Sequence, residues 1–349
     1  VSGEGAEHAL VINLDMPDPG LRKQHWQRAC NESKLRDPET VSERFRITSG
    51  NIHRVARLAE SYAALAKRNE ITLADAQRAT RSLNRQILDA LAIRLSASGD
   101  WSQLAVGGET RRELESLVSR CRHREHLQSQ VGVKASAGVR ALFSGPSGTG
   151  KTRAARLLAA TLQMDDYRLD LSSVVNKYIG ETEKNLNLIL SRAEELDVIL
   201  LLDEGDSLLT QRTGVQSSND RYANLETNFL LQRLESFEGI LLVTTNASER
   251  IDNAFQRRMD VVISFSPPSP PERWAIWQLH LPPDHAVEFS LLEEVAGRCV
   301  LSGGQIKNAA LHASLLALED GGIVTSAMVG DAIEREYRKA GGVCPLRRN

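Results

Sequence analysis

The octapeptide Gly145-Pro146-Ser147-Gly148-Thr149-Gly150-Lys151-Thr152 stands between an apolar segment at 139–143 and a helical pattern at 150–162. It matches the pattern G-x-x-x-x-G-K-[ST], in which glycines let backbone N–H groups surround phosphate oxygens and the helix N-terminus adds its dipole. In such a loop the lysine contacts the β- and γ-phosphates, and the hydroxyl that follows it is a ligand of Mg²⁺. We therefore predict that these eight residues bind a nucleotide, with Lys151 on the phosphates and Thr152 on the metal.

Two carboxylates, Asp203 and Glu204, follow the apolar run 198–202. The run predicts a buried strand, and the carboxyl end of such a strand is the edge at which α/β sheets bind ligands. We expect Asp203 to hold Mg²⁺, directly or through water, and Glu204 to orient and polarise the attacking water. Paired acids after a strand also occur as plain surface residues, but the phosphate loop upstream favours the functional interpretation.

Two further polar features follow in the chain. Asn246 follows the predicted buried strand at 241–245, where it is placed either to position the attacking water or γ-phosphate or simply to form a turn. Arg257 and Arg258 then stand side by side just before the apolar segment 261–265. Arginine is suited to a finger that stabilises developing phosphoryl charge because its guanidinium is planar and permanently charged.

Apolar strand-like segments alternate with helical patterns over residues 139–265. This alternation predicts an α/β fold in which a parallel sheet is covered by helices on both faces. The expected strands are 139–143, 167–170, 198–202, 241–244 and 261–265, and the expected helices are 150–162, 182–195 and 221–236, preceded by an amphipathic helix at 109–127.

In this order and spacing, the motifs resemble the AAA clade of the AAA+ ATPases over about residues 105–268, with the family's helical lid at 269–340. Gly145–Thr152 resembles its Walker A motif, Val198–Glu204 its Walker B motif, Asn246 its sensor 1, and Arg257 and Arg258 its arginine fingers. The resemblance implies ATP/ADP and Mg²⁺ as cofactors, and hexameric rings in which the fingers of one subunit complete the site of the next. In many relatives Pro-Gly separates the two arginines, whereas here they abut, as in the meiotic subgroup. Which of the two reaches the γ-phosphate is therefore open.

Further segments resemble other parts of this clade. The stretch around Lys177, Tyr178 and Ile179 resembles the pore loop that grips a threaded polypeptide, although a core tyrosine at a helix start is the plainer interpretation. An aromatic ring suits an unselective translocator because it contacts almost any side chain through apolar area. The polar segment 210–219 resembles the second pore loop. The lid segment 301–308 resembles the start of the clade's lid helix, whose backbone at Gly303 would face the adenine, and residues 106–108 are a candidate for the adenine-side loop.

Taken together, the sequence of these motifs, from the phosphate loop to the start of the lid helix, most resembles ATPases encoded with bacterial extracellular contractile injection systems. This resemblance implies a cytoplasmic bacterial ATPase that remodels or threads a protein client. The alternative is an assembly factor or scaffold that ATP switches, with little translocation. A loader of DNA is disfavoured because the chain lacks a basic patch.

Part of the sequence is repeated. Residues 10–26 match 261–277 at a constant shift of 251, and residues 48–52 match 302–306 at a shift of 254. The repeat predicts a strand at 10–14 and helices near 21, after 48–50 and at 72–95, matching a strand at 260–265 and helices near 272, after 302–304 and at 325–339. We therefore expect a lid remnant of a preceding module at 1–98, a nucleotide-binding core at 99–268 and a helical lid at 269–349. The chain would then be either a fragment of a tandem-module protein or a protein whose first module has lost its core.

Composition excludes several classes of protein. The 349 residues carry 43 Lys and Arg against 45 Asp and Glu, a net charge of −2, which leaves no electrostatic footprint for nucleic acid. The longest apolar run, 198–202, is far short of the roughly 20 residues that span a bilayer. The four scattered cysteines indicate neither a disulfide framework nor a C-x-x-C metal site, and they favour a reducing compartment. No nucleic acid or membrane partner is expected.

Overall fold

The computed structural model describes residues 16–30, 34–89, 92–95, 98–130, 137–169, 181–203, 205–206, 232–246 and 253–346. They belong to two compact units. The first falls within Val1–Ala90 and includes Ser191–Asp197, and the second comprises Leu91–Leu190 and Val198–Asn349. The strand predicted at 10–14 and most of the helix predicted at 221–236 lie outside the described residues.

The second unit is built on a six-stranded sheet in the order β1-β3-β4-β5-β2-β6. The strands are β1 (Ile93–Leu95), β2 (Val139–Ser144), β3 (Asp166–Leu169), β4 (Ile199–Leu202), β5 (Ile240–Thr245) and β6 (Val261–Ser264). All neighbouring pairs are parallel except β1 with β3. Strands β4 and β5 are buried along their whole length, as expected for central strands of a parallel sheet with helices on both faces. The predicted parallel sheet is confirmed.

Strand β1 corrects the sequence analysis. A helix was predicted to run from 72 to 95, whereas helix α4 (Leu73–Leu88) ends earlier and Ile93–Leu95 pairs antiparallel with β3. A three-residue strand has no periodicity to detect, and its pairing covers an edge of β3 that would otherwise present unpaired backbone groups. The strand belongs to the sheet of the second unit although it precedes residue 98, where we predicted the domain boundary.

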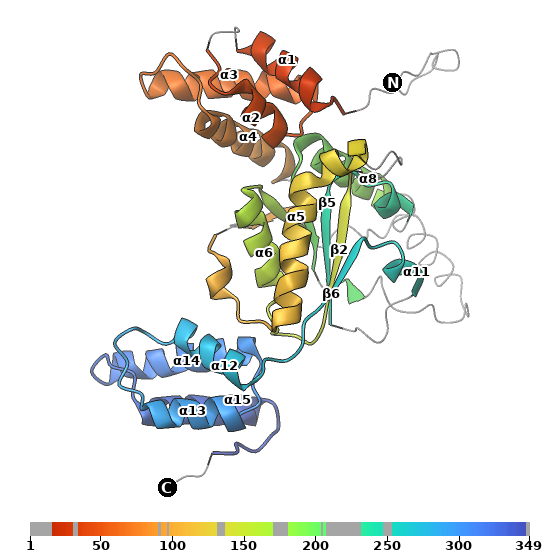
Figure 1. Ribbon diagram of the computed structural model, residues 1–349. Helices are drawn as coiled ribbons and strands as arrows, with labels where there is room; N and C mark the ends of the chain where they lie inside the picture. The colour runs from red at the N-terminus through yellow and green to blue at the C-terminus, as the bar shows by residue number, and fades with distance from the viewer. Residues whose placement is uncertain are drawn as a thin grey trace. The chain divides into compact units, whose positions relative to one another are not determined.

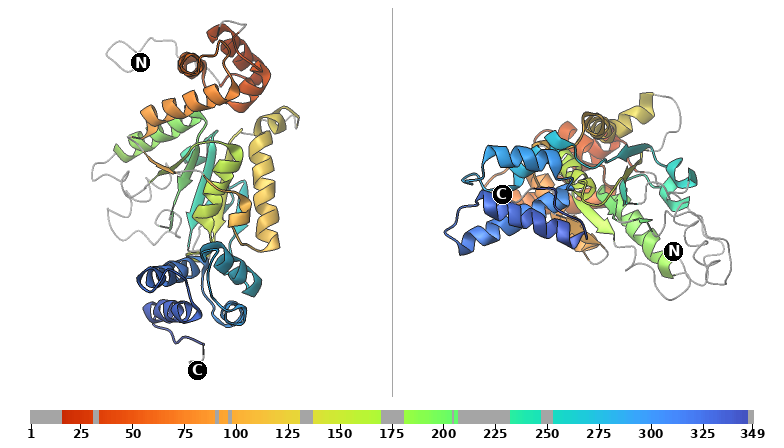
Figure 2. Two further views of the ribbon diagram at one scale, coloured as in Figure 1. Left: turned by 90° about the vertical axis from the view of Figure 1, so that its left-hand side faces the viewer. Right: turned by 90° about the horizontal axis from the view of Figure 1, so that it is seen from below.

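Helices α5 (Gly108–Gln130) and α6 (Lys151–Leu162) cover one face of the sheet, and α8 (Glu181–Leu196) lies on the other (Figures 1 and 2). Under α5 and α6, fully buried apolar side chains such as Leu117, Leu158 and Phe143 form one continuous core. Strands β4, β5 and β2 are adjacent and parallel, so the segments that follow them emerge at one edge of the sheet. The topology thereby brings three motifs together that are 40 to 100 residues apart in sequence.

Four helices form the C-terminal part of the second unit (Figure 1). They are α12 (Pro270–His280), α13 (Phe289–Arg298), α14 (Gly303–Glu319) and α15 (Ser326–Lys339). Their core contains Trp277, 1% exposed, and the buried Arg273, whose Nε donates to the carbonyl of Ala296 at 2.7 Å and whose Nη1 donates to that of Pro268 at 2.7 Å. The lid helices predicted near 272, after 302–304 and at 325–339 are confirmed.

Four helices also form the described part of the first unit up to residue 89, namely α1 (Pro19–Ala29), α2 (Pro38–Arg44), α3 (Ser49–Leu65) and α4. Trp26 is 0% exposed, and the buried Arg22 donates through Nε to Ser42 O at 2.9 Å and through Nη1 to Pro17 O at 2.8 Å. This is the arrangement of Arg273 in the lid, as the sequence repeat leads one to expect.

Within the described ranges, no helix has both the length and the apolar composition that crossing a membrane requires.

Candidate nucleotide-binding site

The loop between β2 and α6 has the backbone that its glycines predict. Gly145, Gly148 and Gly150 have φ angles of 144°, 78° and 101°, in the left-handed region that L side chains rarely adopt. A Cβ atom on Gly145 would lie 2.0 Å from the carbonyl oxygen of Phe265, so only glycine fits where the loop passes the end of β6. The loop therefore wraps closely around the N-terminus of α6, the arrangement that binds phosphate through backbone N–H groups.

Lys151 begins α6 and is 7% exposed. Its Nζ donates to the carbonyls of Gly145 at 2.6 Å and Pro146 at 2.8 Å, and to Oδ1 of Asn246 at 2.9 Å. These three oxygens are uncharged, and a phosphate oxygen would form a stronger bond to the ammonium because that bond is charge-assisted. The structure thus brings Lys151 and Asn246, 95 residues apart in sequence, into direct contact.

Thr152 and Asp203 also meet at this edge of the sheet. The Thr152 hydroxyl lies 3.2 Å from Asp203 Oδ1, which accepts a further hydrogen bond from the Thr244 hydroxyl at 2.5 Å. The donor set is a hydroxyl and a carboxylate, hard oxygen ligands of the kind Mg²⁺ selects while it keeps several waters. The residues present therefore fit a Mg²⁺ ion held by Thr152 and Asp203.

Asp206 is a site residue that the sequence analysis missed. Its Oδ1 accepts hydrogen bonds from the backbone N–H of Asn246 at 3.0 Å and from the hydroxyl of Thr245. The carboxylate thereby fixes the backbone that presents the Asn246 amide to Lys151. The signal was available, since Asp206 is the third acid in the four residues after strand β4.

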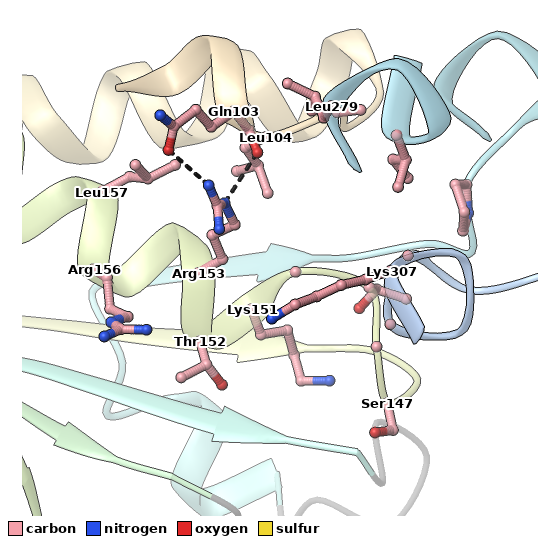
Figure 3. A pocket seen from close by; sticks show the side chains of 18 of the residues that line it. Gln103, Leu104, Ser147, Lys151, Thr152, Arg153, Arg156, Leu157, Leu279 and Lys307 are labelled. Carbon is pink, nitrogen blue, oxygen red and sulfur yellow. Dashed lines mark hydrogen bonds between the residues drawn. The ribbon is translucent and has the colours of Figure 1, made fainter. Parts of the chain in front are cut away.

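The loop opens into a pocket of about 420 Å³, shown in Figure 3. Its walls come from the phosphate loop, from Leu104 and Ala105, and from the lid residues Ile276, His280 and Gly303. The lining thus combines polar and charged groups with apolar side chains, as a nucleotide with a polar tail and a flat base requires. We expected the loop at 106–108 on the base side, but the two residues before it line the pocket, because α5 already begins at Gly108.

The lid closes this pocket by direct backbone contact. The N–H of Gly304 donates to Gly148 O at 3.1 Å, and a Cβ on Gly303 would lie 3.1 Å from the same oxygen. Lys307 extends from α14 into the pocket (Figure 3). Burial, with the nearby cations Lys307 and Arg153, lowers the pKa of His280. His280 was also missed, since a single histidine at the end of a helix carries no signal in sequence.

Residues 141–267 match the family model described as "ATPase family associated with various cellular activities (AAA)". The chain contains an AAA ATPase domain. Domains of this family bind ATP with Mg²⁺ and hydrolyse it, which agrees with the lysine, hydroxyl and carboxylate gathered at the sheet edge.

Three relatives of the chain show where similar AAA domains occur. It is 30% identical over 264 residues to the ATP-dependent zinc metalloprotease FtsH 3 of Sphaerobacter thermophilus, which is 73% of this chain and 53% of the relative. It is 28% identical over 225 residues to the 26S proteasome subunit RPT4 of Saccharomyces cerevisiae, 62% and 51% of the two chains. It is 30% identical over 200 residues to the proteasome-activating nucleotidase 2 of Halobacterium salinarum, 54% and 48%. The chain therefore spans about half the length of these relatives.

The two predicted finger arginines follow helix α11 (Asn253–Gln256) of the AAA domain, and neither lines the pocket. Arg258 forms an ion pair with Glu235 of the same chain, whereas Arg257 is exposed. Since the pair does not reach its own pocket, it does not complete its own nucleotide site.

The remaining predicted residues lie outside the part of the chain that the structure describes. They are Glu204, the pore-loop residues Lys177, Tyr178 and Ile179, and the segment 210–219. Their roles stay predictions.

Proposed function

We propose that this protein is a Mg²⁺-dependent ATPase that assembles into a ring, as the family expectation of a hexamer implies, and remodels or threads protein clients. The main support for ATP hydrolysis is the contact between Lys151 and Asn246. It lies beside the Thr152–Asp203 pair, at one end of the pocket that the lid covers. The loop amides and Lys151 would bind the β- and γ-phosphates, and a Mg²⁺ ion held by Thr152 and Asp203 would neutralise charge on the phosphates. Asn246 orients the terminal phosphate or the attacking water, and Glu204 takes the proton of that water.

Arg257 is the better finger of the two arginines in this proposal. Arg258 is engaged by Glu235 in its own chain, while Arg257 is exposed and available to a neighbouring copy. A finger supplied by a neighbour makes hydrolysis depend on assembly, because the charge that stabilises the transition state arrives from another chain.

The threading part rests on Tyr178 and on the names of the relatives. Two of them are a subunit of the 26S proteasome and a proteasome-activating nucleotidase, and a third is an ATP-dependent metalloprotease. Binding of a client protein by Lys177, Tyr178 and Ile179 would agree with the protein-processing roles in these relatives' names. We further propose that the protein acts in the bacterial cytoplasm on components of a contractile injection system. The basis is the resemblance of its motif sequences to the ATPases encoded with such systems. The division into a lid remnant within 1–98, a core at 99–268 and a lid at 269–349 belongs to the same proposal, with strand β1 now assigned to the core.

The first experiment measures steady-state ATP hydrolysis with Mg²⁺. Lys151→Ala is expected to lower turnover about 10²- to 10³-fold, because it removes a charge aimed at the transferred phosphate. Lys184→Ala, which removes an exposed lysine from α8, is the matched control and should leave turnover unchanged. Equal rates for Lys151→Ala and wild type would refute the ATPase assignment.

A second experiment separates binding from hydrolysis. Glu204→Gln should bind ATP as wild type does and hydrolyse it about 10²- to 10⁴-fold more slowly, since it keeps the shape and loses the base. Wild-type turnover in this variant would show that another group activates the water.

Threading is tested with Tyr178→Ala and an unfolded protein substrate. Processing should be lost while basal hydrolysis is kept, and Tyr178→Phe should behave as wild type because it retains the aromatic ring. If Tyr178→Ala processes the substrate normally, the ATP-switched scaffold becomes the better description.

A further inference from the structure

Asp260 occupies the turn between the finger arginines and strand β6. On the preceding side, the N–H of Arg258 donates to Phe255 O at 3.0 Å, and the side chains of Phe255 and Met259 are 2% and 9% exposed. The turn that carries Arg257 is thus anchored by apolar groups on either side of the arginine pair. What holds its far end is the carboxylate of Asp260.

Strand β2 and helix α5 both donate to that carboxylate. Oδ2 accepts from the backbone N–H of Arg140 at 2.9 Å and from its Nε at 3.0 Å, and Oδ1 accepts from Nη2 of Arg120 at 2.8 Å. The Asp260 N–H donates in return to Arg140 O at 2.8 Å. The Asp260 and Arg140 side chains are 16% and 13% exposed, so the charge-assisted bonds between these two residues are largely shielded from water.

Arg140 extends the network to the other arginine. Its Nη1 donates to the backbone carbonyl of Glu235 at 2.5 Å, and the carboxylate of Glu235 pairs with Arg258. The chain of contacts therefore runs from Asp260 through Arg140 and Glu235 to Arg258 and closes around the turn. Arg257 is exposed, and in the described part of the chain no side chain is found bonded to it.

We propose that Asp260, gripped by Arg140 and Arg120, is a positioning residue for Arg257. It sets the direction in which the finger leaves its own subunit and so aligns it with ATP bound by the neighbouring copy. A misplacement of about 1 Å is enough to cost on the order of 10²-fold in rate at a catalytic group. The inference rests on the proposed function, because it requires hydrolysis in an assembly.

Asp260 and Arg140 lie outside the nucleotide pocket. Asp260→Asn keeps the size of the side chain but removes its charge and turns an amide group toward arginine donors. We expect ATP turnover to fall at least tenfold while the affinity for ADP, measured by calorimetry, stays as in wild type. Asp284→Asn, at an exposed position in the lid, is the matched control and should leave both unchanged. Arg140→Lys, which replaces the planar group that bonds Asp260 through Nε and Glu235 through Nη1 with a single nitrogen, should reproduce the loss of turnover.

Mixing experiments distinguish a misplaced finger from a damaged site. Lys151→Ala chains have a dead pocket and an intact finger, so adding them to Asp260→Asn chains should raise turnover above the sum of the two alone. Adding Arg257→Ala chains instead should give no rise, because neither partner then supplies a finger.

Wild-type turnover in Asp260→Asn, or no rise with Lys151→Ala chains, would overturn the positioning role and leave the proposed function standing. Absence of hydrolysis by the wild-type protein would instead reject the proposed function itself. A variant that merely misfolds is recognised by its loss of ADP binding, and Arg140→Lys then decides the question by the same two readouts.

Discussion

The helices α1–α4 and α12–α15 are built around the same buried groups but present different surfaces. In each set a buried tryptophan and a buried arginine hold the first helix to the others, and the arginine donates to the carbonyl of the same proline position. The matched pairs are Trp26 with Trp277, Arg22 with Arg273, and Pro17 with Pro268. A buried guanidinium is tolerated only when its N–H groups are bonded, so this arrangement restricts the sequence strongly in both sets.

The surfaces differ where α14 of the second set contacts the phosphate loop. Gly303 and Gly304 lie against the phosphate loop, whereas a Cβ on Gly50, the counterpart of Gly304, would meet nothing within 4 Å. Helix α14 also exposes a row of leucines where α3 has smaller or polar residues. The pairs are Leu311 with Arg57, Leu315 with Ser61 and Leu318 with Ala64. The buried groups therefore specify the four-helix fold in both sets, whereas the exposed surface of the helices carries the function.

The largest expected effect concerns the shared tryptophans. Trp26→Ala and Trp277→Ala should each destabilise their own set of helices by about 3–5 kcal/mol, because each leaves a large cavity in a packed core. Only Trp277→Ala should weaken ATP binding, since the described residues that line the pocket all belong to the second unit. Urea unfolding and ADP titration measure the two effects. Equal loss of ADP affinity in both variants would contradict the separation of roles.

The second prediction concerns the carboxylate of Asp75, whose matching position in the second set is occupied by an uncharged methionine. Asp75, 6% exposed, accepts two hydrogen bonds from Arg68 at 2.7 Å each and completes a capping box with Thr72, and the matching position in α15 is Met328. Arg68, with the Thr72 hydroxyl and N–H, holds the pKa of Asp75 far below its usual value of 3.8. The pair therefore stabilises the folded state above about pH 4, and that contribution is lost as the pH falls below this value.

Asp75→Asn should lower the unfolding free energy of the first set by about 2 kcal/mol at pH 7 and flatten its dependence on acid. Trp26 fluorescence, with the chain's other three tryptophans replaced by Phe, follows this set alone. Met328→Leu is the control at the matched position and should leave the acid profile unchanged. A parallel acid profile for Asp75→Asn and wild type would show that the ion pair contributes nothing.

A smaller effect is expected at the glycines. Gly303→Ala places a Cβ 3.1 Å from Gly148 O, which forces the lid and the phosphate loop apart by a few tenths of an ångström. We expect ATP affinity to fall several-fold with little change in lid stability. Gly50→Ala meets no neighbour and should stabilise α3 by about 0.5–1 kcal/mol through helix propensity. Unchanged affinity in Gly303→Ala would show that this contact does not limit closure of the pocket.

The smallest effect should follow from giving α14 the outer face of α3. The triple change Leu311→Arg, Leu315→Ser and Leu318→Ala alters residues that are 68%, 53% and 78% exposed. Surface substitutions of this kind usually change stability by no more than about 0.5 kcal/mol each. Urea unfolding of the isolated chain checks this, with Ala313→Ser at a buried position of the same helix as the destabilising control. A large loss in the triple variant would mean that these leucines are part of the lid core.

Local pattern was enough to predict the phosphate loop, the parallel strands and the repeated helices. The glycine positions around Lys151, the apolar run before Asp203 and the matched Pro, Arg and Trp of the repeat are all features of contiguous sequence. Each reflects a constraint that acts within a few residues, such as a left-handed backbone, burial on both faces of a strand or the start of a helix.

The tertiary structure decided what depends on distant partners. Strand β1 exists because β3 has a free edge, Leu104 and Ala105 line the pocket because of where α5 begins, and Asp206 and Asp260 matter because of the groups they meet. In sequence, Asp260 looks like any other surface acid, and the run of acids after β4 gives no sign that Asp206 holds Asn246. Sequence by itself therefore determined the fold class and the chemistry of the nucleotide site. Which side chains orient that chemistry was decided by contacts between residues 40 to 140 positions apart, whose energies no local pattern records.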